Sequence, residues 1–410
     1  MIKTVQLFSA CFFFACLFNT TIYAQWVPVA TSPTGFVTDH SYGFALDGKG
    51  YLVSGTDQNG NARDDFFQYD PVADEFTQMD DFPGGARGFA IGDTWDGKAY
   101  FGFGSANTTL FRDLWVFDPA TMEWSELATC PCGARRHPAF VALNDKVFVG
   151  LGSGSGGDLS DWWIYDIPTD TWSQGAAFPA ARRHHPYQFG IGDFVYVGFG
   201  HNGPLIYNEW YRFDPATNSW DEMTTLPAEG RVAGQQFAHN GKGYALSGEG
   251  DDHSAMDDGE FWEYDPIEDA WEEMPSHPGT SRWAPASFVL DNEVYLFGGI
   301  VYGFGPPTSM EQGYKFDLGE GDVMSSAPTL ENNNKFGIYP NPAASFLNLQ
   351  TNASLNYKGE FIISDMLGRD IMQFEFDNVK TINIESLQNG AYVISSLDGT
   401  ISKQFIVARK

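Results

Sequence analysis

Short apolar runs and polar turns alternate along residues 26–322 in a fixed order. Each unit contains an apolar run that ends in small residues, such as "VFVGLG" or "VYVGFG", followed by a polar loop rich in glycine. A second apolar run then ends at an aromatic-Asp pair, and a third run begins with an aromatic residue, usually tryptophan. Runs of this kind between Gly, Pro and Asp residues predict β-strands joined by tight turns.

The units repeat with a period close to 50 residues. The aromatic-Asp pair recurs at intervals of 48, 48, 48, 51 and 52 residues. The six pairs are Tyr69-Asp70, Phe117-Asp118, Tyr165-Asp166, Phe213-Asp214, Tyr264-Asp265 and Phe316-Asp317. A period of this length with four short strands per unit is typical of a β-propeller. No unit can bury its apolar faces alone, so we expect neighbouring sheets to stack.

The units resemble kelch repeats in four features. They have an arginine before the first strand, small residues after the second, an Asp-Trp-aromatic-Asp-Pro order in the third and a tryptophan that leads the fourth. They depart from the kelch pattern at one point, because only Gly298-Gly299 is a true double glycine. The resemblance covers residues 26–322 and implies an all-β fold, a six-bladed kelch-type β-propeller.

The repeat also predicts how the propeller closes. The last pair, Phe316-Asp317, is not followed by a tryptophan-led strand, whereas residues 26–30 look like such a strand without a partner. The distance from Trp26 to Phe76, which holds the tryptophan position of the first unit, is 50 residues. We therefore expect the N-terminal strand to complete the sixth blade, which removes two open sheet edges.

Other segments flank the propeller, which we place at residues 25–322. Residues 1–24 combine Lys3, an apolar run and a small residue before Gln25, which predicts a secretory signal peptide. Residues 323–335 are polar and predict a linker, and residues 336–410 form a second strand-rich unit. No later apolar run approaches the roughly 18 residues of a membrane-spanning helix, so we expect no transmembrane segment in the mature chain.

The second unit resembles the C-terminal sorting domain of the type IX secretion system of Bacteroidetes-type bacteria. Four motifs in order carry the resemblance: "YPNP", "DMLGR", "LQNGAYVI" and "KQFIV". Their key residues are Tyr339, Pro340, Asn341, Pro342, Gly368, Arg369, Gly390, Tyr392 and Lys403. The resemblance implies a small Ig-like β-sandwich that the type IX machinery recognises. It also implies passage through the periplasm and a secreted or cell-surface location.

The charge of the chain limits its partners. The formal net charge is −30 at pH 7, and almost all of it lies in the propeller. Nucleic acid and anionic membranes are bound by basic faces, so we exclude both as partners.

Cationic residues before the first strands are the candidate ligand site. We predict that they meet a ligand at the mouth of the channel, and they are Arg87, Arg135, Arg136, His137, Arg182, Arg183, His184, His185, Arg231 and Arg282. Five of these arginines recur with the period, and we call Arg87, Arg135, Arg183, Arg231 and Arg282 the repeat arginines; Asp39 holds the sixth position. Alternatively, the repeat arginines pair with an acid series that lies five residues before each repeat Asp on the third strands, namely Asp65, Asp113, Asp161, Glu209 and Glu260. The extra residues, Arg136, His137, Arg182, His184 and His185, then form a cationic patch for an anionic group, which strengthens below about pH 6.5 as histidines charge.

Two smaller features remain open at this stage. The loop of residues 251–258 contains Asp251, Asp252, Asp257 and Asp258, which form either a Ca²⁺ site or a solvated acidic loop. Cys130 and Cys132 lie in "CPC", and an extended Cys-Pro-Cys segment would strain a bond between them. We expect an inert thiol pair, with metal binding or an intermolecular disulfide as alternatives.

These features favour a binding module for a protein or glycan ligand over an enzyme. The alternative is a carbohydrate-active enzyme on the same scaffold, similar to the kelch-like mutarotases and epimerases or, less closely, to galactose oxidase. The sequence singles out no catalytic residue and no cofactor for either activity.

Overall fold

The computed structural model describes most of the chain after residue 25. The described residues are 26–33, 39–301, 308–319, 336–339, 346–351, 358–365, 369–377, 379–397, 402–407 and 409. The expected signal peptide and linker lie outside them. The described residues form strands and turns, and none of them belongs to a helix that could cross a membrane. The chain divides into two compact units, Met1–Gly321 and Asp322–Lys410.

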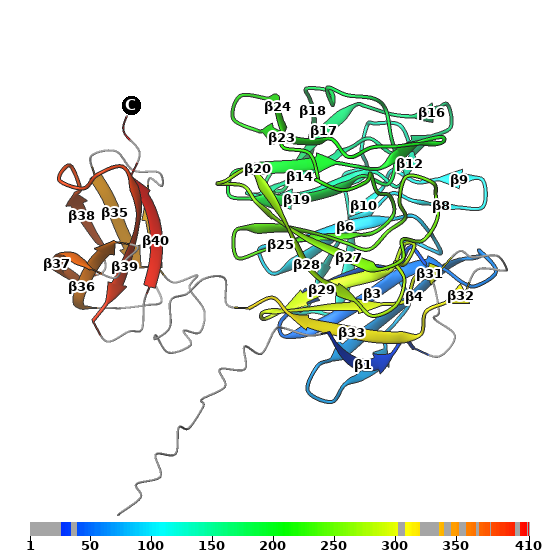
Figure 1. Ribbon diagram of the computed structural model, residues 1–410, viewed down its shortest axis with the longest axis horizontal. Coiled ribbons are helices and arrows are strands. Elements are labelled where there is room, and N and C mark those ends of the chain that lie inside the picture. Colours follow the sequence, from blue (N-terminus) through cyan, green and yellow to red (C-terminus); the bar gives the residue numbers. More distant parts are fainter. Residues whose placement is uncertain are drawn as a thin grey trace, which may run out of the picture. The chain divides into compact units, whose positions relative to one another are not determined.

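Six antiparallel sheets of four strands build the first unit, and we number them by the order of their first strands (Figure 1). Sheet 1 contains β2 (Tyr42–Leu46), β3 (Lys49–Thr56), β4 (Ala62–Asp70) and β5 (Glu75–Gln78). Sheet 2 contains β6 (Ile91–Trp95), β7 (Lys98–Gly102), β10 (Leu114–Asp118) and β11 (Glu123–Leu127). Sheet 3 contains β13 (Ala139–Leu143), β14 (Lys146–Gly150), β17 (Trp162–Asp166) and β18 (Thr171–Gly175).

The remaining three sheets have the same strand order. Sheet 4 contains β19 (Tyr187–Ile191), β20 (Phe194–Gly198), β23 (Trp210–Asp214) and β24 (Ser219–Met223). Sheet 5 contains β25 (Gln235–His239), β26 (Lys242–Leu246), β27 (Gly259–Asp265) and β28 (Ala270–His277). Sheet 6 contains β29 (Ala286–Leu290), β30 (Glu293–Phe297), β33 (Gln312–Asp317) and β1 (Val27–Thr31).

Short strand pairs extend the loops that leave the second strands. They are β8 (Ser105–Ala106) with β9 (Thr109–Leu110), β12 (Arg135–Arg136) with β15 (Ser153–Gly154) and β16 (Gly157–Asp158), β21 (His201–Asn202) with β22 (Leu205–Ile206), and β31 (Ile300–Val301) with β32 (Thr308–Ser309).

Turn residues fix the hairpin between the first and second strands. The two-residue turns Asp47-Gly48, Asp96-Gly97 and Asn240-Gly241 have positive φ at both positions. Asp, Asn and Gly tolerate this conformation, and such turns match the twist of the strands they join. The hairpin register places the apolar residues of each sheet on faces that meet the next sheet.

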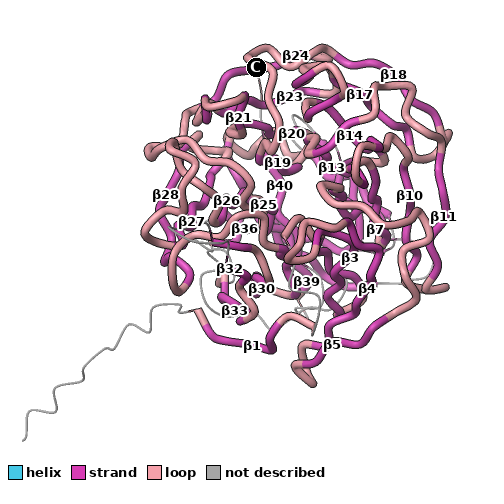
Figure 2. Tube along the Cα trace, turned by 90° about the vertical axis from the view of Figure 1, so that its right-hand side faces the viewer, coloured by secondary structure: helices cyan, strands magenta, loops and turns pink. Residues whose placement is uncertain are grey.

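The first strands lie innermost and contact one another in chain order. Strand β2 contacts β6, and the contacts continue through β13, β19, β25 and β29, which contacts β2 again. Figure 2 shows β13, β19 and β25 on the inside and β11, β18, β24 and β28 on the rim. Each sheet therefore covers an apolar face of its neighbour, as expected from the repeat.

The N-terminal strand completes sheet 6, as the sequence predicts. Strand β1 pairs with β33, with Val27 opposite Lys315. The indole N–H of Trp26 donates to the carbonyl of Pro275 in sheet 5 at 2.7 Å, just as Trp220 of sheet 4 donates to Ala176 of sheet 3 at 2.9 Å.

The junction between sheets 6 and 1 uses the same hydrogen bond as junctions within the chain. The backbone N–H of Ala30 donates to Asp74 of sheet 1 at 2.8 Å. The N–H of Ala128 donates in the same way to Asp170, also at 2.8 Å. The N–H of Ala176 donates to Asn218 and that of Thr224 to Asp269 in the same way. The contact between the two ends of the unit is therefore built like the contacts between sheets 2 and 3, 3 and 4, and 4 and 5.

The second unit contains two sheets. One consists of β34 (Phe336–Tyr339), β35 (Phe346–Thr351) and β38 (Val379–Asn383), and the other of β37 (Asp370–Asp377), β36 (Lys358–Asp365), β39 (Gly390–Ser396) and β40 (Ser402–Val407). Leu347 and Leu349 of the first sheet share one buried core with Phe361 and Ile363 of the second. Two sheets packed on one core are what the expected β-sandwich requires.

Replacing Trp26 tests the role of the N-terminal strand. Its ring is only 6 % exposed and packs on Phe316 and Phe261. We expect Trp26→Ala to lower the free energy of unfolding by about 3–5 kcal/mol, measured by urea denaturation. Val27→Ala on the same strand is the control, since Val27 is 48 % exposed, and should change stability by less than about 0.5 kcal/mol. Equal stability of Trp26→Ala and the parent would show that the strand is not part of the core.

Candidate functional site

The five repeat arginines are buried inside the scaffold. Arg87, Arg135, Arg183, Arg231 and Arg282 are each 0 % exposed. The first four form ion pairs with acids at or directly before the start of the third strand of their own sheet. The pairs are Arg87 with Asp113 (2.8 Å), Arg135 with Asp161 (2.7 Å), Arg183 with Glu209 (3.2 Å) and Arg231 with Glu260 (2.8 Å). The acid series therefore pairs with the arginines, which is the scaffold alternative of the sequence analysis.

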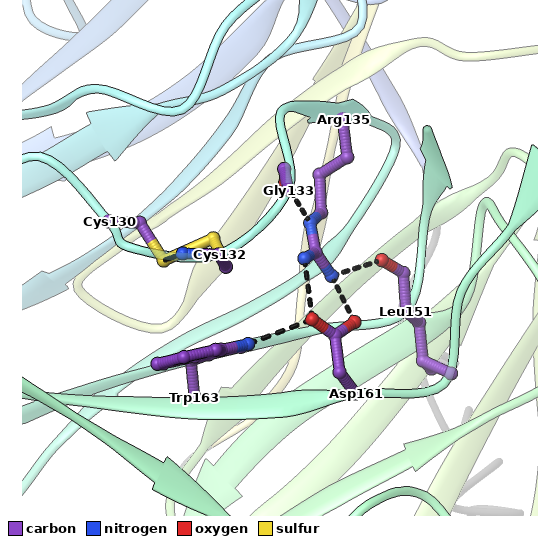
Figure 3. Close-up of polar contacts among 7 residues, drawn as sticks. All are labelled: Cys130, Cys132, Gly133, Arg135, Leu151, Asp161 and Trp163. Atoms are coloured by element: carbon purple, nitrogen blue, oxygen red, sulfur yellow. Dashed lines mark hydrogen bonds and ion pairs between the residues drawn. A yellow bond between two sulfur atoms is a disulfide. The ribbon is translucent and has the colours of Figure 1, made fainter. Parts of the chain in front are cut away.

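Sheet 3 shows the geometry of this pair (Figure 3). Arg135 binds both oxygens of Asp161 with Nη1 and Nη2, at 2.7 and 2.8 Å. It also donates to the carbonyls of Leu151 and Gly133, both at 2.9 Å. Trp163 donates its indole N–H to Asp161 at 2.8 Å, which explains why an aromatic residue follows two positions after the acid. Burial raises the pKa of Asp161, but the hydrogen bonds and charge of Arg135 outweigh it and hold the pKa below its ordinary value.

Two positions depart from this pattern. Arg282 lies opposite Gln312 instead of an acid and donates to the backbone carbonyls of Gly298 and Gln312 at 3.0 and 3.1 Å. Burial without a carboxylate lowers its pKa to about 10. In sheet 1 the acid Asp65 binds Arg63 at 2.6 Å.

The repeat arginines do not line the cavity described below. Their guanidinium groups hold the first strand against the third, so we assign them to the scaffold and correct their placement in the ligand site. Only Arg136 and Arg182 of the predicted cationic residues are exposed. Arg136 lies over the ring of Phe89, 5.7 Å from its centroid.

Removing one carboxylate tests the scaffold role. Asp161→Ala leaves the charge of Arg135 buried without its partner, which costs about 3 kcal/mol of unfolding free energy or more. The control is Asp221→Ala, because Asp221 pairs with Arg212 while 55 % exposed, and exposed pairs contribute about 1 kcal/mol or less. Urea denaturation of both variants measures the difference. A similar small loss of unfolding free energy in both variants would show that the arginine–acid pair does not stabilise the fold.

Six equivalent residues, which we call the axial residues, precede the first strands of sheets 1 to 6. They are His40, Phe89, His137, His185, Ala233 and Ala284, and all have φ between 45° and 63°. Their backbones bond across the sheets: the N–H of His40 donates to Ala284 at 2.9 Å, that of His137 to Phe89 at 3.0 Å, and that of His185 to His137 at 3.2 Å. Glycines after the second strands allow this close approach; a Cβ on Gly152 would lie 2.8 Å from the carbonyl oxygen of Arg136.

The axial position also corrects the alignment of the first unit. Asp39 forms a bridge with Thr56 as Gly88 does with Ser105 and Trp283 with Ile300. Asp39 therefore follows the arginine position, which falls at residue 38, outside the described residues. His40, next in the chain, is then equivalent to His137 and His185.

The histidines of three sheets converge. His40 Nε2 lies 3.0 Å from His185 Nε2, and the ring centroids of His137 and His185 are 3.4 Å apart. His185 Nδ1 lies 3.4 Å from His201 Nε2. His184 lies 3.0 Å from Asp158. We call His40, His137, His184, His185 and His201 the histidine cluster. His40 and His201 were not predicted from the sequence, and only the alignment of the axial residues could have revealed His40.

Four members of the histidine cluster resist protonation, namely His137, His184, His185 and His201. Burial lowers the pKa of His137 and His185 well below the ordinary value, and neighbouring histidines lower both further. Burial lowers the pKa of His201 to about 3. Burial also lowers the pKa of His184 more than Asp158 raises it. The expectation that these histidines charge below about pH 6.5 and attract an anion is therefore wrong in direction, because the folded environment favours neutral imidazole.

A cavity of about 490 Å³ lies among the first strands of all six sheets, and we call it the channel. His40, His137 and His185 line it where the strands begin, and Asp93 lines it from the middle of β6. Gln188 also lines it, is 4 % exposed, and has no partner for either amide atom among the described residues. Aromatic residues such as Tyr42 and Phe237 cover much of the remaining wall.

Asp93 makes the stability of the fold depend on pH. Burial raises its pKa from 3.8 to about 7, although the N–H groups of Ala142 and Thr94 oppose the shift. Between about pH 4 and 7 the folded state therefore binds more protons than the unfolded chain, and the free energy of unfolding falls as pH rises. In the Asp93→Asn variant we expect the decrease in unfolding free energy between pH 4 and 7 to be smaller by on the order of 2 kcal/mol. Urea denaturation from pH 4 to 8 measures it. Asp96→Asn, in the neighbouring turn, should keep the parent's pH profile, and an unchanged profile for Asp93→Asn would contradict the assignment.

The structure decides the fate of the two cysteines and leaves the acidic loop a prediction. Cys130 and Cys132 form a disulfide, with Cα atoms 5.1 Å apart, within the usual range. The expectation of an inert thiol pair is wrong, because the segment turns and buries both cysteines (Figure 3). Within the described ranges, the side chains grouped closely enough to hold a metal ion are all histidines, and the acidic loop of residues 251–258 is not among them.

The sorting motifs lie partly within the described residues. Tyr339 ends β34, Gly390 begins β39, and Lys403 belongs to β40. Tyr392 is buried and donates to the carbonyl of Gln388 at 3.0 Å. Pro340, Asn341, Pro342 and Gly368 lie outside the described residues, and Arg369 directly precedes β37.

Comparison with known proteins identifies the second unit. Residues 337–408 match the family described as the secretion system C-terminal sorting domain. No curated protein matches the chain. The match indicates a protein that the type IX secretion system exports, either into the medium or to the cell surface.

Proposed function

We propose that the exported chain is a six-bladed kelch-like propeller that binds a glycan within its channel. The proposal has three parts beyond the sorting domain: a signal peptide at residues 1–24, a kelch-type propeller at residues 25–322 and a glycan ligand. The sorting domain at residues 336–410 then serves delivery only, after the linker at residues 323–335.

The arrangement of the sheets supports a kelch-type propeller. Six four-stranded sheets follow one another, and the junction of sheets 6 and 1 repeats a hydrogen bond that also joins sheets 2 and 3, 3 and 4, and 4 and 5. The arginine before the first strand and the acid of the third strand form the same bonds in sheets 2 to 4.

The unpartnered amide of Gln188 in the channel is the observation that carries the proposed function. A buried amide without partners is costly, and a ligand hydroxyl can both donate to Oε1 and accept from Nε2. The volume of the channel lies in the usual range of small-ligand sites, and its lining combines polar side chains such as Gln188 and Gln235 with aromatic rings such as Tyr42. A sugar unit offers hydroxyls for the amide and C–H faces for the aromatic rings.

A carbohydrate-active enzyme on the same scaffold is the second candidate. Asp93 favours it, because a carboxyl group with a pKa of about 7 is suited to proton transfer near neutral pH. Both of its oxygens accept backbone N–H groups, from Thr94 at 2.8 Å and Ala142 at 2.9 Å. Binding without turnover is therefore the proposal that the geometry favours.

A glycan array probed with the purified exported protein tests the proposal. We expect binding to a limited set of glycans, and at least 10-fold weaker binding by Gln188→Ala at an unchanged melting temperature. Gln174→Ala is the matched control, since Gln174 is exposed on the rim strand β18.

Two results would overturn the glycan proposal: no glycan bound above background, or equal affinity of Gln188→Ala and the parent. NMR spectra of the bound sugar after incubation separate the two candidates. Chemical conversion that Asp93→Asn abolishes would replace the binding module with an enzyme.

A further inference from the structure

We propose that His40, His137 and His185 bind one divalent transition-metal ion of the Zn²⁺ type at the end of the channel. Each ligand comes from the axial position of a different sheet: 1, 3 and 4. The site is therefore assembled only when distant parts of the chain meet.

The distances fit three nitrogen ligands around one ion. One ring nitrogen from each histidine lies within 4.8 Å of the others, and the Nε2 atoms of His40 and His185 are 3.0 Å apart. Zinc–nitrogen bonds of about 2.0–2.1 Å in a tetrahedral site place the ligand nitrogens about 3.3 Å from each other. The ring centroids of His40 lie 5.1 and 5.2 Å from those of His137 and His185, whereas the rings of His137 and His185, 3.4 Å apart, must separate when the ion binds.

His137 supplies the strongest evidence that the cluster awaits a ligand. Its residue is 8 % exposed, and neither ring nitrogen has a hydrogen-bond partner among the described residues. Buried polar groups without partners are rare in folded proteins, and each one requires an explanation. A bound metal ion would satisfy one nitrogen of His137 directly.

The fold itself does not require histidine at these positions. Phe89, Ala233 and Ala284 hold the equivalent axial positions with the same left-handed backbone conformation. Apolar side chains therefore suffice for the packing of three sheets. Three imidazoles that converge between the aromatic rings of Phe89 and Trp283 are better explained by a ligand that binds nitrogen.

The chemistry of the donor set selects the class of ion. Three imidazole ligands without a thiolate suit Zn²⁺, Cu²⁺ or Ni²⁺, whereas Ca²⁺ and Mg²⁺ require oxygen ligands. The other nitrogen of His40, Nδ1, lies 3.4 Å from a carboxylate oxygen of Asp39. A carboxylate behind a histidine ligand is a common way to orient the ring. All three histidines also line the channel, so a fourth coordination position would face the cavity.

A second group, His184, His185 and His201, has comparable spacing. His184 is already held by Asp158 at 3.0 Å, and all three members belong to sheet 4 and its loop. In the group of His40, His137 and His185, both ring nitrogens of His137 lack a hydrogen-bond partner among the described residues. We therefore place the ion in that group, and a variant of His201 in the second group serves as the control.

Zinc titration of the exported protein tests the site. The protein is prepared without a polyhistidine tag, stripped with a chelator, and titrated with Zn²⁺ against a chromophoric competitor at 0.15 M salt, which screens binding to surface acids. We expect one tight site per chain and an X-ray absorption spectrum with nitrogen ligands at about 2.0–2.1 Å.

Variants locate the ion. His137→Phe gives sheet 3 a phenylalanine at the axial position, as Phe89 is in sheet 2, so we expect this variant to fold. Its melting temperature without metal checks that it does. We expect His137→Phe to weaken binding at least 100-fold and to lose the rise in melting temperature that Zn²⁺ gives the parent. His201→Ala should keep the affinity of the parent within a few fold.

Three outcomes would overturn the proposal: no tight site in the parent, tight binding retained by His137→Phe, or loss of binding in His201→Ala alone. A metal-free His137→Phe that does not fold would be replaced by His40→Phe, judged by the same criteria. Glycan binding on the array does not depend on these outcomes, so the two proposals fail separately.

Discussion

Each sheet of the first unit is apolar on both faces and must be covered on both. Phe101, for example, lies in the second strand of sheet 2 and packs on Phe82 and Tyr42, which come from the segments before it. A linear stack would always leave two faces open, whereas a sequence of six sheets in which β29 returns to β2 leaves none. The N-terminal strand serves this constraint, because Trp26 covers the apolar surface of the last sheet.

The buried arginine–carboxylate pairs hold sheets 2 to 5 together at the edge where their first, innermost strands begin. They tie the start of the first strand to the third strand of its own sheet, as Arg135 does with Asp161. Backbone hydrogen bonds between axial residues then link sheets 6 and 1, 2 and 3, 3 and 4, and 5 and 6. These contacts leave the axial side chains without a structural duty, which is why phenylalanine, alanine and histidine can occupy equivalent positions. Side chains that the scaffold does not require are the ones that can change with function.

Much of this architecture could be predicted from the sequence. The period of about 50 residues located the strands, and the unpaired "WVPVA" segment identified the strand that completes sheet 6. The acid series five residues before each repeat Asp identified the partners of the arginines. Both predictions rest on local pattern and fixed spacing, which survive folding unchanged.

The histidine cluster could be predicted only in part. His137 and His185 share a spacing of 48, but His40 was hidden by a shift of one position in the first unit, which only the backbone bridges reveal. Burial reversed the expected pH behaviour of His137 and His185, and burial depends on which side chains surround the rings after folding. The disulfide of Cys130 and Cys132 was missed for a similar reason, since the turn between them is not encoded in the spacing.

The central claim is that the packing of six sheets brings three histidines from separate sheets to one point. A crystal structure of the exported protein grown with Zn²⁺, with data collected on both sides of the zinc absorption edge, tests it most directly. The account predicts one strong anomalous peak within bonding distance of ring nitrogens of His40, His137 and His185. Histidine rings that point apart, or zinc found only among surface carboxylates, would contradict it.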